Sequence, residues 1–445
     1  MIPRQLSCYY IYAILLVAAC KTTKPNESDL KFYGADNQSA IMLFDAEIEF
    51  NLPKNIKSKE ALLIPPHAAE IQELIDWQVK HLYGAFTTHD AFRKNPGILE
   101  GKGKTKVISA EIDAAEGRGR VRYSHSDRVV FKKKVLNSPN PTITFVLPRA
   151  PVEIYSKGVT DSSGFNHCTD EHYNSESDFW YFWNPNQKDC PIRPEDLVEV
   201  TAKLSAIPNT KSTYPDYEKI LGDNGNGKTI KIIYLIGVDE NFKAGDLGSG
   251  TYQEAFDLLR ANKFKVKSSI RRKSVLTYTT PNYEVEVDLR LMDPGSKQFV
   301  AAAADGLETA DIFIYDGHSG LGGYLYTDRF ESALGRPLKL PATKSQIFYF
   351  NGCSTFAYYN ADYFNLKKSD SDPDGKKFLD IITTSIGASF DIGARHDIEV
   401  ITSLVDGSRP SWQTIMDKVY KADRKQTALS HVNGDEDNPS TPGNQ

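Results

Sequence analysis

Two short apolar runs in the second half of the chain each end in a reactive side chain flanked by small residues, and they constrain the fold most. Residues 312–315 lead into Asp-Gly-His318, and residues 347–350 lead into Asn-Gly-Cys353. Both runs are rich in β-branched and aromatic residues and stop at a glycine, which predicts buried strands closed by tight turns. Because strand ends line the ligand crevice of an open parallel sheet, the pattern predicts a thiol and an imidazole at one sheet edge.

The segments around these runs alternate between strand and helix patterns. Residues 229–238 form an apolar run typical of a central strand, and residues 251–263 place apolar side chains on one helical stripe. Further strand patterns lie at 275–292 and 378–390, and further helix patterns lie at 298–309 and 411–422. The alternation predicts an α/β domain over residues 228–430, with a mostly parallel sheet flanked by helices.

A smaller domain of α+β type is expected upstream, over residues 41–222. A helix pattern preceded by two prolines covers residues 66–86. Strand patterns follow at residues 106–112, 118–123, 128–136 and 142–147. The polar, proline-containing end of the chain, residues 431–445, is expected to be disordered.

The first 20 residues resemble a bacterial lipoprotein signal peptide. Arg4 precedes an apolar stretch, and Val-Ala-Ala-Cys20 matches the small-residue cleavage site at which the cysteine receives lipid. Residues 21–40 would then be a polar tether. This resemblance implies a bacterial cell-envelope protein held by lipid on Cys20, at the outer membrane or the periplasmic face. An ordinary secretory signal cut nearby is the alternative, and both place the chain outside the cytoplasm.

The chain has 5 cysteines, and an exported location changes how they are interpreted. Cys168 and Cys190 flank an aromatic and polar loop in a compartment where disulfides persist, so we expect them to pair. Cys353 is then the thiol left over, and an unpaired cysteine in an exported protein indicates a role. A small buried hydrophobic residue at a strand end is the structural alternative for Cys353.

A histidine after one strand and Gly-Cys after the next resemble the caspase-like (clan CD) cysteine peptidases. The resemblance implies that Cys353 is the nucleophile, that His318 protonates the leaving amine, and that the backbone N–H groups of Ser319 and Cys353 form the oxyanion hole. Gly352-Cys353 matches the family pattern, whereas Ser319 stands where the family has glycine. The implied function is an endopeptidase acting on a peptide or protein substrate. The alternative is a catalytically inactive caspase-like binding or scaffold lipoprotein.

Several further residues are candidates for supporting roles. Asp316 precedes His318 by two positions and either orients it or, as we favour, is an acidic turn residue. Asp391, after the apolar run that ends at residue 390, is a candidate for the floor of an acidic specificity pocket. Asp370, Asp372 and Asp374 copy the first half of a calcium loop, but position twelve is an isoleucine, so a solvated acidic insertion is favoured over a weak Ca²⁺ site.

Two patterns argue against nucleotide and nucleic-acid binding. Residues 222–229 satisfy the P-loop pattern letter for letter, but they precede a strand instead of following one, which indicates a linker. The formal net charge of −5 offers no basic surface for nucleic acid. The proposed peptidase chemistry requires no cofactor.

Overall fold

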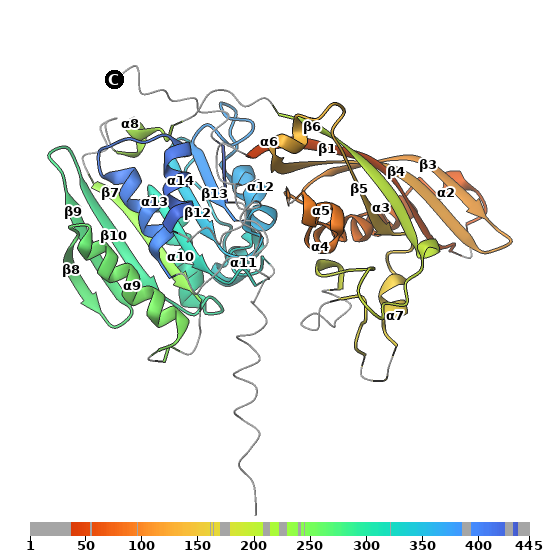
Figure 1. The fold of residues 1–445 in the computed structure, drawn as a ribbon, viewed down its shortest axis with the longest axis horizontal. Coiled ribbons are helices and arrows are strands. Elements are labelled where there is room, and N and C mark those ends of the chain that lie inside the picture. The colour runs from red at the N-terminus through yellow and green to blue at the C-terminus, as the bar shows by residue number, and fades with distance from the viewer. Residues whose placement is uncertain are drawn as a thin grey trace, which may run out of the picture. The chain divides into compact units, whose positions relative to one another are not determined.

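The computed structural model describes most of the chain (Figure 1). The described residues are 37–53, 56–95, 97–160, 162, 164–169, 179–207, 214–221, 229–238, 242–243, 245–320, 322–384, 393–422 and 430–434. The fold divides into two compact units. We call them the N-terminal unit, which contains Asp36–Thr210 and Phe356–Ala361, and the C-terminal unit, which contains Lys211–Thr355 and Asp362–Gln445.

The N-terminal unit is built on a 6-stranded antiparallel sheet of order β2-β4-β1-β6-β5, with β3 paired to β4. Its two longest strands, β1 (Asn37–Asn51) and β4 (Arg118–Lys132), pair along their whole length. The sequence predicted two strands where β4 is one. That prediction was wrong because the unbroken ladder with β1 carries the chain through the polar residues between the two patterns.

Helices α3 (His67–Lys80) and α4 (Leu82–Thr88) supply the other part of this unit's core, so the predicted helix at residues 66–86 is two helices. The buried amide of Gln78 ties α3 to the sheet, since it donates to the carbonyls of Glu47 and Pro148 and accepts from the Tyr123 hydroxyl. The remaining elements are α2 (Lys59–Leu62), α5 (Asp90–Lys94), β2 (Gly97–Leu99), β3 (Lys104–Asp113), α6 (Lys133–Leu136), β5 (Thr142–Pro148), α7 (Ile154–Gly158), η3 (Phe179–Tyr181), η4 (Pro194–Asp196) and β6 (Leu197–Ala206).

The predicted disulfide between Cys168 and Cys190 is confirmed. Cys168 is fully buried and belongs to a small apolar cluster with Ile154, Phe179 and Trp183. The disulfide therefore closes a segment that has its own small apolar core.

The C-terminal unit contains an 8-stranded mixed sheet of order β14-β13-β12-β11-β7-β10-β9-β8. Its strands are β7 (Thr229–Gly237), β8 (Lys265–Ile270), β9 (Lys273–Thr279), β10 (Glu284–Leu291), β11 (Ile312–Gly317), β12 (Gln346–Asn351), β13 (Leu379–Thr383) and β14 (His431–Asn433). The strands from β13 to β10 run parallel, whereas β14 pairs antiparallel with β13, and β9 pairs antiparallel with β10 and β8. The domain is α/β as expected, but antiparallel strands flank the parallel centre.

Helices cover both faces of this sheet (Figure 1). On one face, side chains such as Tyr234 and Tyr349 share a core with α9 (Leu247–Ala261), α13 (Arg395–Val405) and α14 (Trp412–Ala422). On the other face lie α10 (Lys297–Thr309), whose Phe299 contacts Tyr315, and α12 (Thr355–Lys367), whose Tyr363 contacts Phe350. A further helix between strands is α11 (Thr327–Leu334), and a short α8 (Tyr217–Ile220) precedes β7. The apolar strands are therefore buried on both sides.

The expectation that the chain is disordered from residue 431 was wrong at its start. Residues His431–Asn433 form β14, and the Asn433 amide donates to the Ile381 carbonyl at 3.2 Å and to Thr383 Oγ1 at 3.1 Å. A polar segment can be ordered here because the edge of β13 offers backbone partners that its own sequence does not reveal.

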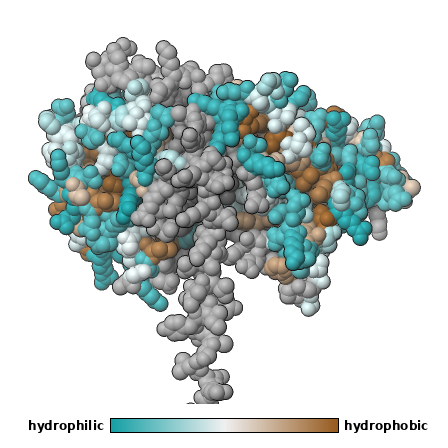
Figure 2. All heavy atoms as spheres, in the orientation of Figure 1, coloured by the Kyte–Doolittle hydropathy of each residue, from teal (hydrophilic) through white to brown (hydrophobic). Residues whose placement is uncertain are grey.

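On the face shown in Figure 2, most of the described surface is hydrophilic, and the hydrophobic residues lie between hydrophilic ones. The most exposed large apolar side chain among the described residues is Ile270, at 73% exposure, on edge strand β8. Lys265 and Lys267 on the same strand place charge along this edge, which discourages pairing with another sheet. Among the described helices, none combines the length and the apolar character that crossing a membrane requires.

Candidate active site

The two predicted turns lie side by side at the carboxyl ends of two parallel strands in the C-terminal sheet. Strands β11 and β12 are parallel neighbours in a register that pairs Asp316 with Asn351. His318 and Cys353 each follow these paired residues by two positions. The Ser319 hydroxyl donates to the Cys353 carbonyl at 2.6 Å, so the turns are joined directly. The structure thus places the turn that carries His318 and Ser319 next to the turn that carries Cys353.

The His318 turn is fixed by backbone contacts to the neighbouring strand. The His318 N–H donates to the Gly237 carbonyl at 3.1 Å, and the buried Tyr315 hydroxyl donates to the His318 carbonyl at 2.6 Å. The imidazole itself is exposed to solvent. The main chain is therefore held in place while the ring stays accessible to a ligand.

Two fully buried threonines fix the Cys353 turn. Thr355 Oγ1 donates to the Phe350 carbonyl at 2.7 Å and accepts from the Thr384 N–H at 2.8 Å. Ser354 has φ of 54° and leads into α12, whose helical residues begin at Thr355. Cys353 is half-buried and lies outside the disulfide, two residues before the start of that helix. A helix N-terminus favours an anion such as a thiolate.

Close approach of the two turns explains the glycine before the cysteine. A Cβ atom on Gly352 would lie 2.6 Å from the Gly317 carbonyl oxygen and 2.9 Å from Ser319 Oγ. Both distances are shorter than side-chain atoms tolerate, so a larger residue would push the turns apart. The left-handed backbone of the histidine turn falls on Gly320, with φ of 57°, and Ser319 precedes it. A non-glycine residue is therefore accommodated at position 319.

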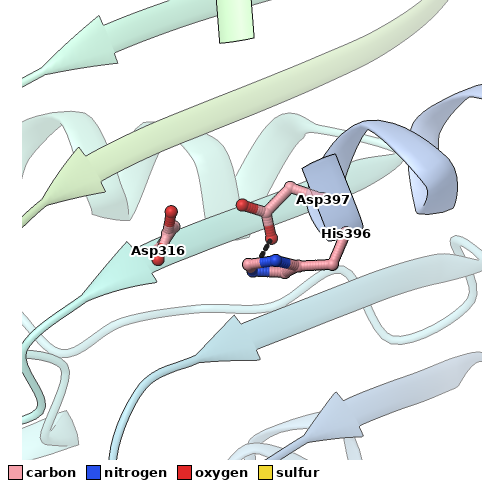
Figure 3. Close-up of side chains that lie close together, drawn as sticks. All are labelled: Asp316, His396 and Asp397. Atoms are coloured by element: carbon pink, nitrogen blue, oxygen red, sulfur yellow. Dashed lines mark ion pairs between the residues drawn. The ribbon is translucent and has the colours of Figure 1, made fainter. Parts of the chain in front are cut away.

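Beneath the turns lies a buried polar cluster, which we define as Tyr234, Asp316, Asn351, His396 and Asp397. Asn351 comes from β12. Asp316 comes from β11, and His396 and Asp397 come from the first turn of α13 (Figure 3). The Asn351 amide donates to Asp316 Oδ1 at 2.9 Å and contacts His396 Nε2. The Tyr234 hydroxyl donates to Asp397 Oδ2 at 2.6 Å, and His396 Nε2 lies 3.6 Å from Asp397 Oδ1.

This cluster corrects the interpretation of Asp316 as an acidic turn residue. Its side chain is 2% exposed, and it lies inside strand β11. Its carboxylate bonds to Asn351 and lies near the α13 residues. Asp316 therefore supports the base of the two turns through Asn351.

Burial controls the ionisation of the cluster. Burial, followed by repulsion from Asp397, raises the pKa of Asp316 well above its usual range. Burial lowers the pKa of His396, against attraction from Asp316. Burial also raises the pKa of Tyr234, with a further contribution from Asp397. The hydroxyl therefore stays protonated and donates a hydrogen bond to the Asp397 carboxylate.

The other predicted site residues lie elsewhere. Asp372 is 5% exposed and accepts from the backbone N–H groups of Lys376 at 3.2 Å and Lys377 at 3.0 Å, whereas Asp370 and Asp374 are exposed. Among the described residues, the group whose metal-ligating atoms lie within 4.8 Å of one another is Asp316, His396 and Asp397. Cys20 and Asp391 lie outside the described residues.

Sequence reasoning missed four members of the cluster, Tyr234, Asn351, His396 and Asp397. Asn351 did carry a signal, because it and Asp316 are polar residues at matching places in two apolar strands. His396 and Asp397 carried none, since their partners lie far away in the sequence.

The comparisons with known proteins add little to this picture. A scan against protein-family models gives no match, and a search of curated proteins finds no significant similarity. Among solved structures, the crystal structure of the binary complex of an AgrE mutant with L-arginine is 10% identical, with a TM-score of 0.15. The alignment covers 87% of this chain and 58% of that chain, so this chain corresponds to less than two thirds of its length. A likeness this low supports no conclusion about fold or function.

Proposed function

We propose that the C-terminal unit is a caspase-like cysteine endopeptidase domain, and that Cys353 and His318 form its catalytic dyad. The observation that carries the proposal is the hydrogen bond between Ser319 and the Cys353 carbonyl, which joins the two turns at the ends of neighbouring parallel strands. A half-buried thiol and an exposed imidazole on these turns are the parts that nucleophilic catalysis on a peptide requires.

The proposed reaction passes through an acyl-enzyme. The Cys353 thiolate attacks the peptide carbonyl carbon, and the backbone N–H groups of Ser319 and Cys353 donate to the resulting oxyanion. His318 protonates the nitrogen of the leaving amine as the carbon–nitrogen bond breaks. Water, deprotonated by His318, then attacks the thioester and releases the acid and the thiol. No cofactor takes part in these steps.

An inactive binding or scaffold protein of the same fold is the second candidate. The observation that favours it is the buried Ser319 side chain, at 3% exposure, which occupies space between the turns that the family pattern leaves to glycine. If this hydroxyl is required only to hold the turns together, the site would bind a peptide without cleaving it.

A thiol-directed peptidyl probe with an electrophilic warhead separates the two candidates. Under reducing conditions, we expect labelling of the wild-type chain at Cys353, loss of labelling in Cys353→Ser, and strong reduction in His318→Ala. His67→Ala is the matched control, because His67 lies in the N-terminal unit and pairs with Glu70 at 2.9 Å. Equal labelling of wild type and His318→Ala would refute the dyad.

Location and specificity complete the proposal. The chain would be anchored by lipid on Cys20 in the bacterial cell envelope, and its substrate would be a peptide or protein there. Asp391 would favour Lys or Arg before the scissile bond. Fluorogenic peptides that differ only at that residue test the specificity, and incorporation of labelled palmitate into wild type but not into Cys20→Ala tests the anchor.

A further inference from the structure

We infer that the buried polar cluster binds one divalent metal ion of the zinc type, with Asp316, His396 and Asp397 as protein ligands. This site would be structural, because it lies beneath the two turns and its ligands are buried. The inference goes beyond the proposed peptidase and does not depend on it, since none of its ligands is His318 or Cys353.

The geometry of the three side chains suits a small ion. Their ligand atoms lie within 4.8 Å of one another, and His396 Nε2 lies 3.6 Å from Asp397 Oδ1. Zinc–ligand bonds of about 2.0 to 2.2 Å in tetrahedral geometry place neighbouring ligand atoms roughly 3.3 to 3.6 Å apart. The His396–Asp397 pair is therefore already at the required spacing, and the ligand atom of Asp316 lies within 4.8 Å of both.

Charge gives the second argument. The cluster contains two carboxyl groups that are 2% and 0% exposed, and its basic side chain is the His396 imidazole. Two ionised carboxylates in this setting are costly unless a cation compensates them. A divalent ion would compensate both.

The partners around the ligands already orient them. Tyr234 donates to Asp397 Oδ2 at 2.6 Å, which leaves Oδ1 on the side of the imidazole. Such hydrogen bonds to a ligating carboxylate are typical around metal sites. Asn351 contacts both Asp316 and His396, and rotation of its amide by half a turn would present the amide oxygen as a fourth ligand.

The kinds of ligand atom in the cluster indicate which metal ion it would bind. One imidazole nitrogen together with carboxylate and amide oxygens is a borderline set, which suits Zn²⁺ better than Ca²⁺ or Mg²⁺. Calcium would require six to eight oxygen ligands, and the cluster does not provide them.

Metal analysis of the purified full-length chain tests the inference. We expect close to one zinc per chain, or uptake of one equivalent of Zn²⁺ after chelation and dialysis, with a rise in melting temperature. Asp316→Asn and His396→Gln should lose this uptake, whereas Asp380→Asn should keep it, because Asp380 is a buried aspartate outside the cluster. Tyr234→Phe should bind metal roughly 10- to 100-fold more weakly, since it removes only a hydrogen bond to a ligand.

Substitution with Co²⁺ distinguishes this cluster from Cys353 as the binding site. Visible d–d bands without sulfur-to-cobalt charge transfer, retained in Cys353→Ser, would support nitrogen and oxygen ligands. A wild-type chain that contains no metal and shows no change in melting temperature with Zn²⁺ would overturn the inference. Equal uptake by wild type, Asp316→Asn and His396→Gln would overturn it as well. Because Cys353→Ser keeps the cluster, failure of the peptidase proposal leaves this result unaffected.

Discussion

Replacing Ser319 with alanine removes a side-chain hydrogen bond between the two candidate catalytic turns. Ser319 is 3% exposed, and its hydroxyl donates to the Cys353 carbonyl at 2.6 Å. The substitution leaves the backbone unchanged, because Ser319 does not adopt a left-handed conformation. Its effect therefore reports the value of this contact.

The expected loss is about 1 to 3 kcal/mol of local stability, since the Cys353 carbonyl loses its Ser319 hydrogen-bond partner in a partly buried place. This loss corresponds to roughly 5- to 150-fold faster opening of the turns, because about 1.4 kcal/mol equals a factor of ten. Hydrogen exchange of the peptides that contain residues 317–320 and 350–355, measured by mass spectrometry on the full chain, should report it.

Ser345→Ala is the matched control. Ser345 is 8% exposed in the same unit, and its hydroxyl makes no hydrogen bond to the described residues. The same atom is therefore removed at similar burial without loss of a bond, and exchange should change little. If Ser319→Ala leaves exchange in both turns within a factor of about two of wild type, the turns are held together by other contacts and our reasoning is refuted.

Three further predictions concern stability. His89 is buried, and burial lowers its pKa to about 4. As the pH falls from 6.5 to 4, the unfolded chain therefore binds a proton at this residue before the folded chain does, and stability should fall by at most about 3 kcal/mol. His89→Leu should reduce this loss in urea titrations. Burial lowers the pKa of Lys367 to about 7, so stability should rise between pH 7 and 10.5 by at most about 1.4 kcal/mol per pH unit. Thermal melts of Lys367→Met should lack this contribution to the rise. Replacing Cys168 and Cys190 by serine should cost roughly 3 kcal/mol in urea unfolding, given the sequence separation of 22, and an unchanged midpoint would contradict the chain-entropy argument.

The local pattern of the sequence was sufficient to locate most strands of the C-terminal unit and three of its helices, α9, α10 and α14, whereas α8, α11, α12 and α13 were not predicted. The apolar runs before His318 and Cys353 end at glycines, and both are strands in the structure. Polar segments whose order depends on a partner strand were harder to predict. The tail at β14 and the middle of β4 are ordered by neighbouring strands, and local propensity does not encode those neighbours.

By itself, the sequence determined which residues carry reactive groups and that two of them end buried strands, because strand period, glycine turns and cysteine pairing are local properties. Only the tertiary structure decided what lies beneath those groups. Tyr234 and Asp397 are 163 positions apart, yet they share a hydrogen bond because the start of α13 lies near the carboxyl ends of β7 and β11. Polar residues at such distances meet only when strand register and helix packing are both fixed. A buried cluster of this kind is therefore a property of the folded chain, and no local sequence pattern predicts it.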